Sequence, residues 1–146
     1  MRASDFLTSE ERNRLESAIA EAEHNTSGEI RIHIDRKCSS DPREKALKTF
    51  HKLGMTKTAA RNAVLIYVAC ESRQFVVLGD KGINEAVPAG FWKDVCAILG
   101  DSFSKGSQAD GLEKAVILIG RKLKAFFPYQ SDDINELSDE ISIDEN

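Results

Sequence analysis

Apolar residues recur at two different spacings along this chain, and the two spacings separate the predicted helices from the predicted strands. Helical spacing appears first, so we expect an amphipathic helix over residues 9–24. Thr8 and Glu11 have the spacing of a capping box, in which each side chain satisfies a backbone N–H at the start of a helix. The apolar stripe of this helix consists of Leu15, Ala18, Ile19 and Ala22.

Three short segments have strand patterns instead. Isoleucines alternate with polar residues over 29–34, which predicts a half-buried strand. The run "AVLIYVAC" (63–70) is continuously apolar and of strand length, so we expect a central strand covered on both faces. Four polar residues separate it from "FVVL" (75–78), and this spacing fits a β-hairpin with a four-residue loop.

Three further helices complete the pattern. Asp41 and Pro42 look like an N-cap followed by proline at the first helical position, and Gly54 ends that helix. Another helix is expected from about Pro88, and the last one stops before Pro128. The element order is therefore α-β-α-β-β-α-α. It predicts an α/β domain whose small mixed sheet contains one parallel βαβ pair and a β-hairpin.

The predicted topology brings polar residues together that lie far apart in the sequence. The two strands of the βαβ unit run parallel, and the hairpin returns the third strand antiparallel to them. The end of the third strand, at Asp80, should therefore lie beside the starts of the other two strands. The residues at those starts are Glu29, Arg61 and Asn62. We thus expect one polar edge of the sheet.

Two interpretations of this edge are open. The carboxylates of Glu29 and Asp80 and the amide oxygen of Asn62 are hard ligands that suit Ca²⁺ or Mg²⁺, and Arg61 could neutralise charge or hold a phosphate. Alternatively, these residues are ordinary turn residues at strand ends, with a plain surface ion pair between Glu29 and Arg61. Spacing alone favours the second interpretation.

Charge is distributed unevenly along the chain. The net charge is −4, and residues 131–146 hold seven acidic residues and no Lys or Arg, which leaves +3 on residues 1–130. The basic residues are scattered, so we expect no nucleic-acid binding. We predict a single domain over 1–130 and an acidic tail over 131–146. The tail contains four apolar residues, so we expect 131–142 to dock loosely on the domain and only the last few residues to be disordered.

The chain has no apolar run near the roughly 20 residues that span a bilayer, and its first residues lack the apolar region of a secretory signal. Its three cysteines are far apart and odd in number, which fits a reducing compartment. We therefore expect a cytoplasmic, monomeric protein that does not bind membranes.

Other kinds of site have little support. The three histidines lack zinc-ligand spacing, and no phosphate-cradling glycine loop or nucleophile elbow is present. Cys70 and Cys96 lie within apolar patterns and are expected in the core. Trp92 lies on the stripe of the third helix, where packing is the first interpretation and a lid over the polar edge is the second.

From about Phe6 to Ser142, the chain resembles the cytoplasmic, stand-alone branch of the TPM domain family, which is named in part for thylakoid-lumen phosphatase-like and photosystem II repair proteins. The matching segments are "SGEIRIHI" (27–34), "ARNAVLIYVA" (60–69), "FVVLGDKGI" (75–83), "FW" (91–92), "GLEKAVILIG" (111–120) and "FP…SDDINELSDEIS". The resemblance implies a three-layer α/β/α sandwich and a divalent-metal site, for calcium in particular, in an acidic cleft. It also implies the acid phosphatase activity proposed for some members.

By position, Glu29, Asn62 and Asp80 match the polar cleft of that family, and Asp110 is a fourth candidate. Many members have a signal peptide and a membrane anchor, and we expect neither in this chain. It also has Asp80 and Lys81 where several members have an aromatic-glycine pair.

Two functions follow from this resemblance. The first is a metal-binding adaptor or quality-control module with an unknown protein partner. The second is a weak metal-dependent phosphatase, with Arg61 and Lys81 binding the phosphate anion. The sequence favours the first function, because it contains no identifiable nucleophile or general base.

Overall fold

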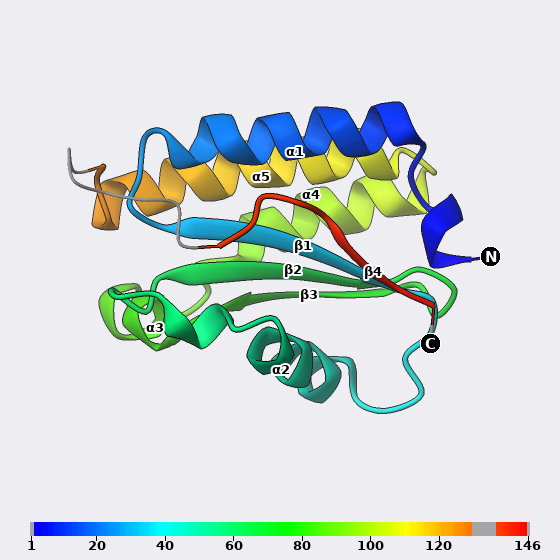
Figure 1. Cartoon of the computed structure of the whole chain (residues 1–146), viewed down its shortest axis with the longest axis horizontal. Coiled ribbons are helices and arrows are strands. Elements are labelled where there is room, and N and C mark those ends of the chain that lie inside the picture. Colours follow the sequence, from blue (N-terminus) through cyan, green and yellow to red (C-terminus); the bar gives the residue numbers. More distant parts are fainter. Residues whose placement is uncertain (1, 130–136, 146) are drawn as a thin grey trace.

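Four strands form a single mixed sheet in the order β3-β2-β1-β4 (Figure 1). This computed structural model describes residues 2–129 and 137–145. β1 and β2 run parallel, and β3 returns antiparallel to β2, so the predicted βαβ pair and hairpin are confirmed. The strands are β1 (Glu29–Asp35), β2 (Ala63–Ala69), β3 (Gln74–Gly79) and β4 (Ser142–Asp144).

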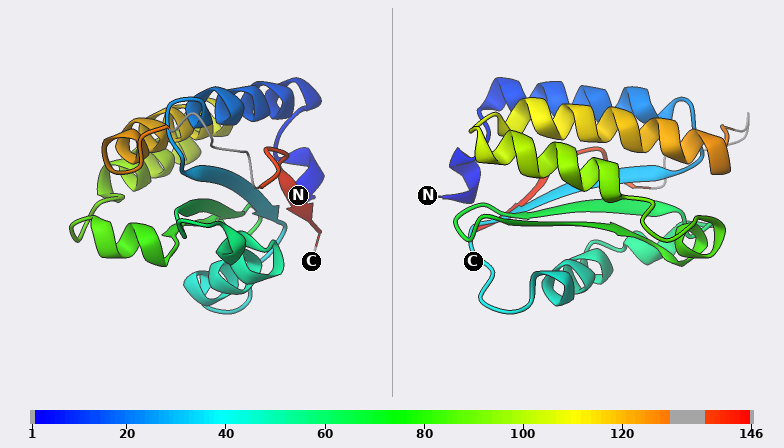
Figure 2. Two further views of the ribbon diagram at one scale, coloured as in Figure 1. Left: turned by 60° about the vertical axis from the view of Figure 1, so that its left-hand side comes forward. Right: turned by 180° about the vertical axis from the view of Figure 1, so that it is seen from behind.

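Helices cover both faces of the sheet and confirm the three-layer α/β/α sandwich. α1, α4 and α5 lie on one face, whereas α2 and α3 lie on the other (Figures 1 and 2). The α-helices are α1 (Ser9–Glu23), α2 (Pro42–Lys52), α3 (Lys81–Ala86), α4 (Lys93–Ser104) and α5 (Gln108–Phe126). Two 3₁₀ turns, Ala3–Asp5 and Met55–Lys57, complete the described elements. In the described part of the chain, no helix is long and apolar enough to cross a membrane.

The sheet separates two apolar cores. Ile30, Ile32 and Ile34 of β1 pack toward α1 and α5 in the larger core, whereas Leu65 and Tyr67 of β2 pack toward α2 in the smaller one. β2 is buried along its whole length, as its continuous apolar run predicts. The half-buried character predicted for β1 is wrong, because six of its seven residues are buried. β1 lies inside the sheet, with β2 paired along one edge and β4 along the end of the other.

Two elements differ from the expected set of helices. α3 was not predicted, and it begins directly after Asp80, whose carboxylate caps it by accepting a hydrogen bond from Lys81 N. The helix expected from about Pro88 begins only at Lys93, because Gly90 adopts the left-handed conformation (φ 77°) within the preceding turn. Both differences lie next to the predicted polar edge.

The described part of the acidic tail forms a strand. β4 pairs parallel with the end of β1, and Ile141 just before it is 5% exposed. The Glu145 carboxylate accepts hydrogen bonds from the N–H groups of Ala3 (2.7 Å) and Ser4 (3.1 Å). The tail therefore joins the sheet to the N-terminus, more closely than simple docking implies. The remainder of the predicted tail, residues 131–136 and Asn146, lies outside the described residues.

Candidate functional site

The predicted polar edge exists, but an ion pair dominates it. Arg61 donates from Nε to Asp80 Oδ2 (2.7 Å) and from Nη2 to Asp80 Oδ1 (2.9 Å). These hydrogen bonds are the main reason why the pKa of the Arg61 guanidinium is raised. Because Asp80 Oδ1 also accepts from Lys81 N (2.7 Å), the carboxylate is occupied on both oxygens. Asp80 here caps a helix and holds an arginine.

Glu29 and Asn62 share that end of the sheet but point to different faces. Successive side chains of a strand alternate between faces, so Asn62 follows Val64 toward α5, whereas Glu29 lies on the α2 face. Asn62 Nδ2 donates to Ser27 Oγ (3.3 Å), and Glu29 Oε1 accepts from Leu137 N (2.5 Å). The structure thus brings these residues to one end without assembling one ligand set.

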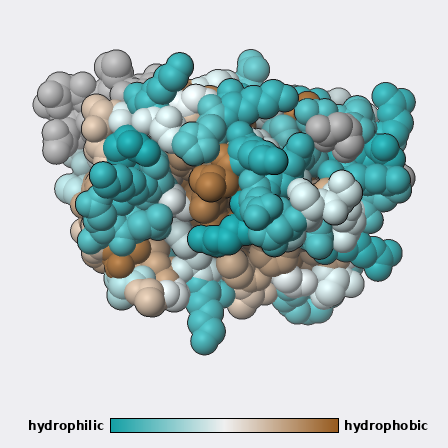
Figure 3. Space-filling view, turned by 90° about the horizontal axis from the view of Figure 1, so that it is seen from below, coloured by the Kyte–Doolittle hydropathy of each residue, from teal (hydrophilic) through white to brown (hydrophobic). Residues whose placement is uncertain are grey.

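A pocket of about 760 Å³ lies between α2 and the start of α3. Arg61, Asp80 and Lys81 line it, together with Arg43 and Glu85, so its walls carry both signs of charge. Figure 3 views this face of the molecule, where hydrophilic side chains surround a small hydrophobic area. The pocket is not the acidic cleft that the resemblance implies.

The two remaining candidates lie elsewhere. Trp92 does not line the pocket; its ring lies against Gly79, where an added Cβ would be 3.4 Å from Trp92 Cζ2, and it packs on the larger core. Asp110, in the first turn of α5, accepts a hydrogen bond from Arg14 Nη2 (2.9 Å). Figure 1 shows that α5 begins at the opposite end of the sheet from α3. In residues 2–129 and 137–145, no group of three or more His, Cys, Asp or Glu is arranged to hold a metal ion.

Three carboxylates come near one another where α1, β1 and the C-terminal segment meet. Of these three, the sequence had pointed only to Glu29. Glu23 Oε2 accepts from Ile30 N (2.8 Å), and the Glu23 carboxyl is also hydrogen-bonded to that of Asp139. Burial is the largest cause that raises the pKa of Glu23 to about 10, followed by the bond to Asp139 and the negative charges of Asp139 and Glu29. We call Glu23, Glu29 and Asp139 the carboxylate cluster. The sequence could not predict this cluster, because Asp139 reaches the other two residues only when the C-terminal segment docks on the domain.

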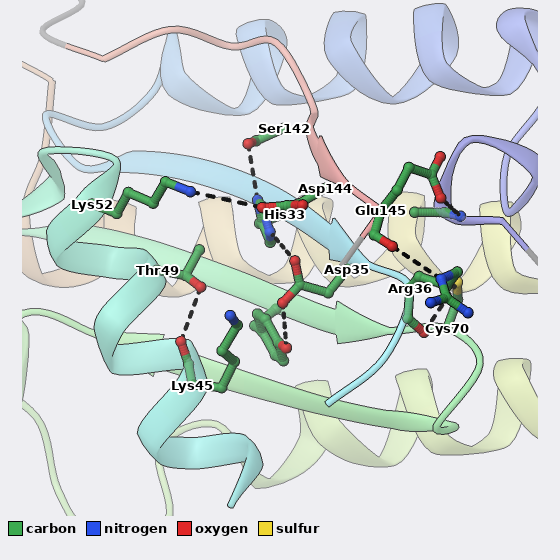
Figure 4. Close-up of polar contacts among 12 residues, drawn as sticks. His33, Asp35, Arg36, Lys45, Thr49, Lys52, Cys70, Ser142, Asp144 and Glu145 are labelled. Carbon is green, nitrogen blue, oxygen red and sulfur yellow. Dashed lines mark hydrogen bonds and ion pairs between the residues drawn. The ribbon is translucent and has the colours of Figure 1, made fainter. Parts of the chain in front are cut away.

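A second missed feature is a buried polar chain on the α2 face (Figure 4). Ser142 Oγ lies 2.9 Å from His33 Nδ1, and His33 Nε2 lies 2.7 Å from Asp35 Oδ1. The hydroxyl of Tyr67 donates a hydrogen bond to Asp35 Oδ2 (2.6 Å). Burial alone would raise the pKa of Asp35, but the hydrogen bonds from His33 and Tyr67 outweigh it, so that pKa is lowered. In the sequence, the only indication of this network was that His33 and Asp35 alternate with the isoleucines of β1.

This polar chain has the serine–histidine–aspartate order of a nucleophile relay. The His33 side chain, however, is only 7% exposed, and Ser142 belongs to β4, which His33 holds against β1. Fastening the last strand explains the arrangement without any substrate. We therefore interpret it as structural.

The TPM domain family matches residues 1–122. The NMR structure of the BA42 protein from the psychrophilic bacterium Bizionia argentinensis has a TM-score of 0.90 and 42% identity, and the match covers 95% of this chain and 96% of that one. No curated protein matches this chain.

Two more distant NMR structures show the fold alone. The N-terminal domain of the cg2496 protein from Corynebacterium glutamicum has a TM-score of 0.65 at 13% identity, covering 89% of this chain and 81% of that one. The N-terminal domain of a protein from P. gingivalis has a TM-score of 0.65 at 16% identity, covering 87% of this chain and 83% of that one.

Proposed function

This chain belongs to the TPM domain family, and from that premise we propose that it is a divalent-cation-binding adaptor domain whose cation binds at the carboxylate cluster. The cation would be Ca²⁺ or Mg²⁺, because carboxylate oxygens are the hard ligands that both ions prefer. Glu29 is the one residue of the sequence-based candidate set that takes part. Asp80 does not, because Arg61 occupies both of its oxygens.

The observation that carries this proposal is that the Glu23 and Glu29 carboxylates meet β1 and the C-terminal segment, where they accept hydrogen bonds from Ile30 N (2.8 Å) and Leu137 N (2.5 Å). The raised pKa of Glu23 supports it. Burial disfavours its charged form, and the hydrogen bond to Asp139 requires a proton between the two carboxyl groups. Glu29 adds a further negative charge nearby. A divalent cation would neutralise the same charges that the proton now neutralises, so cation binding would release a proton.

The three carboxylates are hard oxygen ligands that suit such an ion. As they lie in the described structure they are not arranged to hold a metal ion, so binding would require their side chains to move together. Glu23 and Glu29 each accept a backbone hydrogen bond, from Ile30 N and Leu137 N. A cation would leave one carboxylate oxygen of each residue in that role and draw on the other, with Asp139 as the third ligand. Because Asp139 lies in the C-terminal segment, the ion would also tie this segment to β1.

The test is a titration of the full chain with Ca²⁺ and with Mg²⁺, followed by NMR and by calorimetry in two buffers of different ionisation heat. We expect amide shifts over residues 23–30 and 137–141 and a buffer-dependent heat that reports the released proton. Glu23→Gln and Asp139→Asn should weaken binding. Asp110→Asn is the matched control, because Asp110 is exposed and paired with Arg14.

Two results would count against the proposal. Absence of shifts in these segments at millimolar cation, or equal affinity in Glu23→Gln and the wild type, would exclude the carboxylate cluster. Cation-dependent hydrolysis of an aryl phosphate that is lost in Asp80→Ala would instead favour the phosphatase alternative, with Arg61 and Lys81 binding the phosphate.

A further inference from the structure

Two arginines have unusual backbone conformations. Among the described residues, Arg61 (φ 51°) and Arg73 (φ 55°) are the non-glycine residues with positive φ. Residues other than glycine and asparagine are strained in this conformation, and such strain is retained where the side chain has a structural or functional role. At Arg61 the use is visible, because the guanidinium binds Asp80 twice.

Arg73 has no corresponding partner. It ends the turn between β2 and β3, it is exposed, and its guanidinium makes no hydrogen bond or ion pair with any residue that the structure describes. Glycine would satisfy the backbone at this position without strain. No contact within the described chain therefore explains why an arginine occupies this strained position. Binding of an anionic ligand by its guanidinium would explain it.

Arg73 lines an aromatic pocket of about 710 Å³. Its walls include Phe6, Phe75 and Phe103, and the ring of Phe103 meets the other two edge to face, with centroids 5.7 Å from Phe6 and 5.5 Å from Phe75. The residues that line the pocket come from the end of β2, from the β2–β3 turn and from α4 with the turn that follows it. Figure 2 shows these two turns at the same end of the sheet.

Gln74, the next residue, also lines the aromatic pocket. Its amide oxygen is buried and has no hydrogen-bond partner among residues 2–129 and 137–145. A buried acceptor without a partner is unfavourable. Rotation of the Gln74 side chain toward the pocket would let a donor group on a ligand satisfy that oxygen.

We propose that the aromatic pocket binds a small aromatic carboxylate whose ring bears a hydrogen-bond donor. The ring packs against Phe75 and Phe103, the carboxylate pairs with the Arg73 guanidinium, and the donor reaches the Gln74 amide. None of these residues belongs to the carboxylate cluster, so the inference goes beyond the proposed function and does not depend on it.

The binding test uses indole-3-acetate as the probe, with tryptamine as a comparison that carries the same ring and the opposite charge. NMR titration of the full chain should shift the amides of Phe75, Gly100 and Phe103, which line the pocket. Tryptamine should bind about tenfold more weakly than indole-3-acetate, because Arg73 repels its ammonium group. Equal affinity for the two probes, or no shifts at these residues, would overturn the proposal.

Variants separate binding from folding. Arg73→Gln should weaken indole-3-acetate binding about tenfold and leave tryptamine no weaker. Arg43→Gln, which removes an exposed arginine on α2, should change neither affinity. Arg73→Gly should raise the melting temperature by removing strain and should still lose affinity for the carboxylate. Unchanged affinity for indole-3-acetate in both Arg73 variants would show that the arginine is not its partner.

Discussion

Arg61 and Asp80 form a two-bonded ion pair, with 2.7 Å from Nε to Oδ2 and 2.9 Å from Nη2 to Oδ1. The pair joins the residue that precedes β2 to the residue that follows β3, and Asp80 at the same time caps α3. The Asp80 side chain is 6% exposed, whereas that of Arg61 is 41% exposed. The carboxylate is thus the buried partner, and its loss should have the larger effect.

Asp80→Asn should lower the free energy of unfolding by about 2 kcal/mol, because a buried carboxylate that accepts charge-assisted bonds is replaced by a weaker acceptor. Urea unfolding measures this change. Asp101→Asn is the control, since Asp101 pairs with Lys105 in an exposed i,i+4 bridge that contributes less than about 0.5 kcal/mol. Equal losses in the two variants would contradict the structural role of Asp80.

Tyr67→Phe should destabilise the protein by about 2 kcal/mol, because the hydroxyl that donates to Asp35 Oδ2 at 2.6 Å is buried with its partner. The hydrogen bond from Tyr67 helps to lower the pKa of Asp35. A lowered carboxyl pKa stabilises the folded state above the unfolded pKa, and this contribution is lost as pH falls through the folded value.

The Tyr67→Phe variant should therefore unfold in acid at a higher pH than the wild type. Circular dichroism during acid titration measures that midpoint. Tyr129→Phe, which changes a tyrosine that is 50% exposed, should leave both the stability and the acid midpoint unaltered. An acid midpoint that does not move in Tyr67→Phe would argue against the hydrogen bond.

The raised pKa of Glu23 predicts that stability falls as pH rises, which is opposite to the effect of Asp35. Its pKa is raised from 4.5 to about 10 in the folded chain, so the folded state binds more protons than the unfolded state between these values. Stability then falls as pH rises through this window, by at most about 1.4 kcal/mol per pH unit for one proton. Glu23→Gln keeps a neutral donor and should flatten the dependence of stability on pH between about pH 5 and about pH 9. The same slope in both proteins would show that Glu23 is not the group responsible.

Two glycines in the packed helices should respond to alanine with opposite signs. A Cβ on Gly111 of α5 would lie 2.6 Å from Ser102 Oγ, so Gly111→Ala forces α4 and α5 apart and should cost about 1–3 kcal/mol. On Gly100 of α4 the nearest neighbour would be Phe75 Cζ at 3.9 Å, so Gly100→Ala should stabilise the helix by up to about 1 kcal/mol. Melting temperatures of the two variants that move in the same direction would contradict this difference.

Local patterns were sufficient for the central part of the fold. The continuous apolar run of β2, the four polar residues after it and the capping box of Thr8 each reflect a short-range rule, and all three appear in the structure. α3 and β4 were missed because neither carries an independent local signal. α3 is a six-residue helix that depends on the Asp80 cap, and β4 is a three-residue strand that exists only because β1 offers an open edge.

The sequence by itself determined which residues meet at one end of the sheet, because strand direction follows from the order of helices and hairpin. It could not determine which face each side chain occupies or which partner it has. Alternation along the strands places the side chains of Asn62 and Glu29 on different faces of the sheet. Arg61 donates hydrogen bonds to both carboxylate oxygens of Asp80. Only the tertiary structure brought Asp139 to Glu23, since a carboxyl pair that shares a proton depends on burial and docking, which no local pattern encodes.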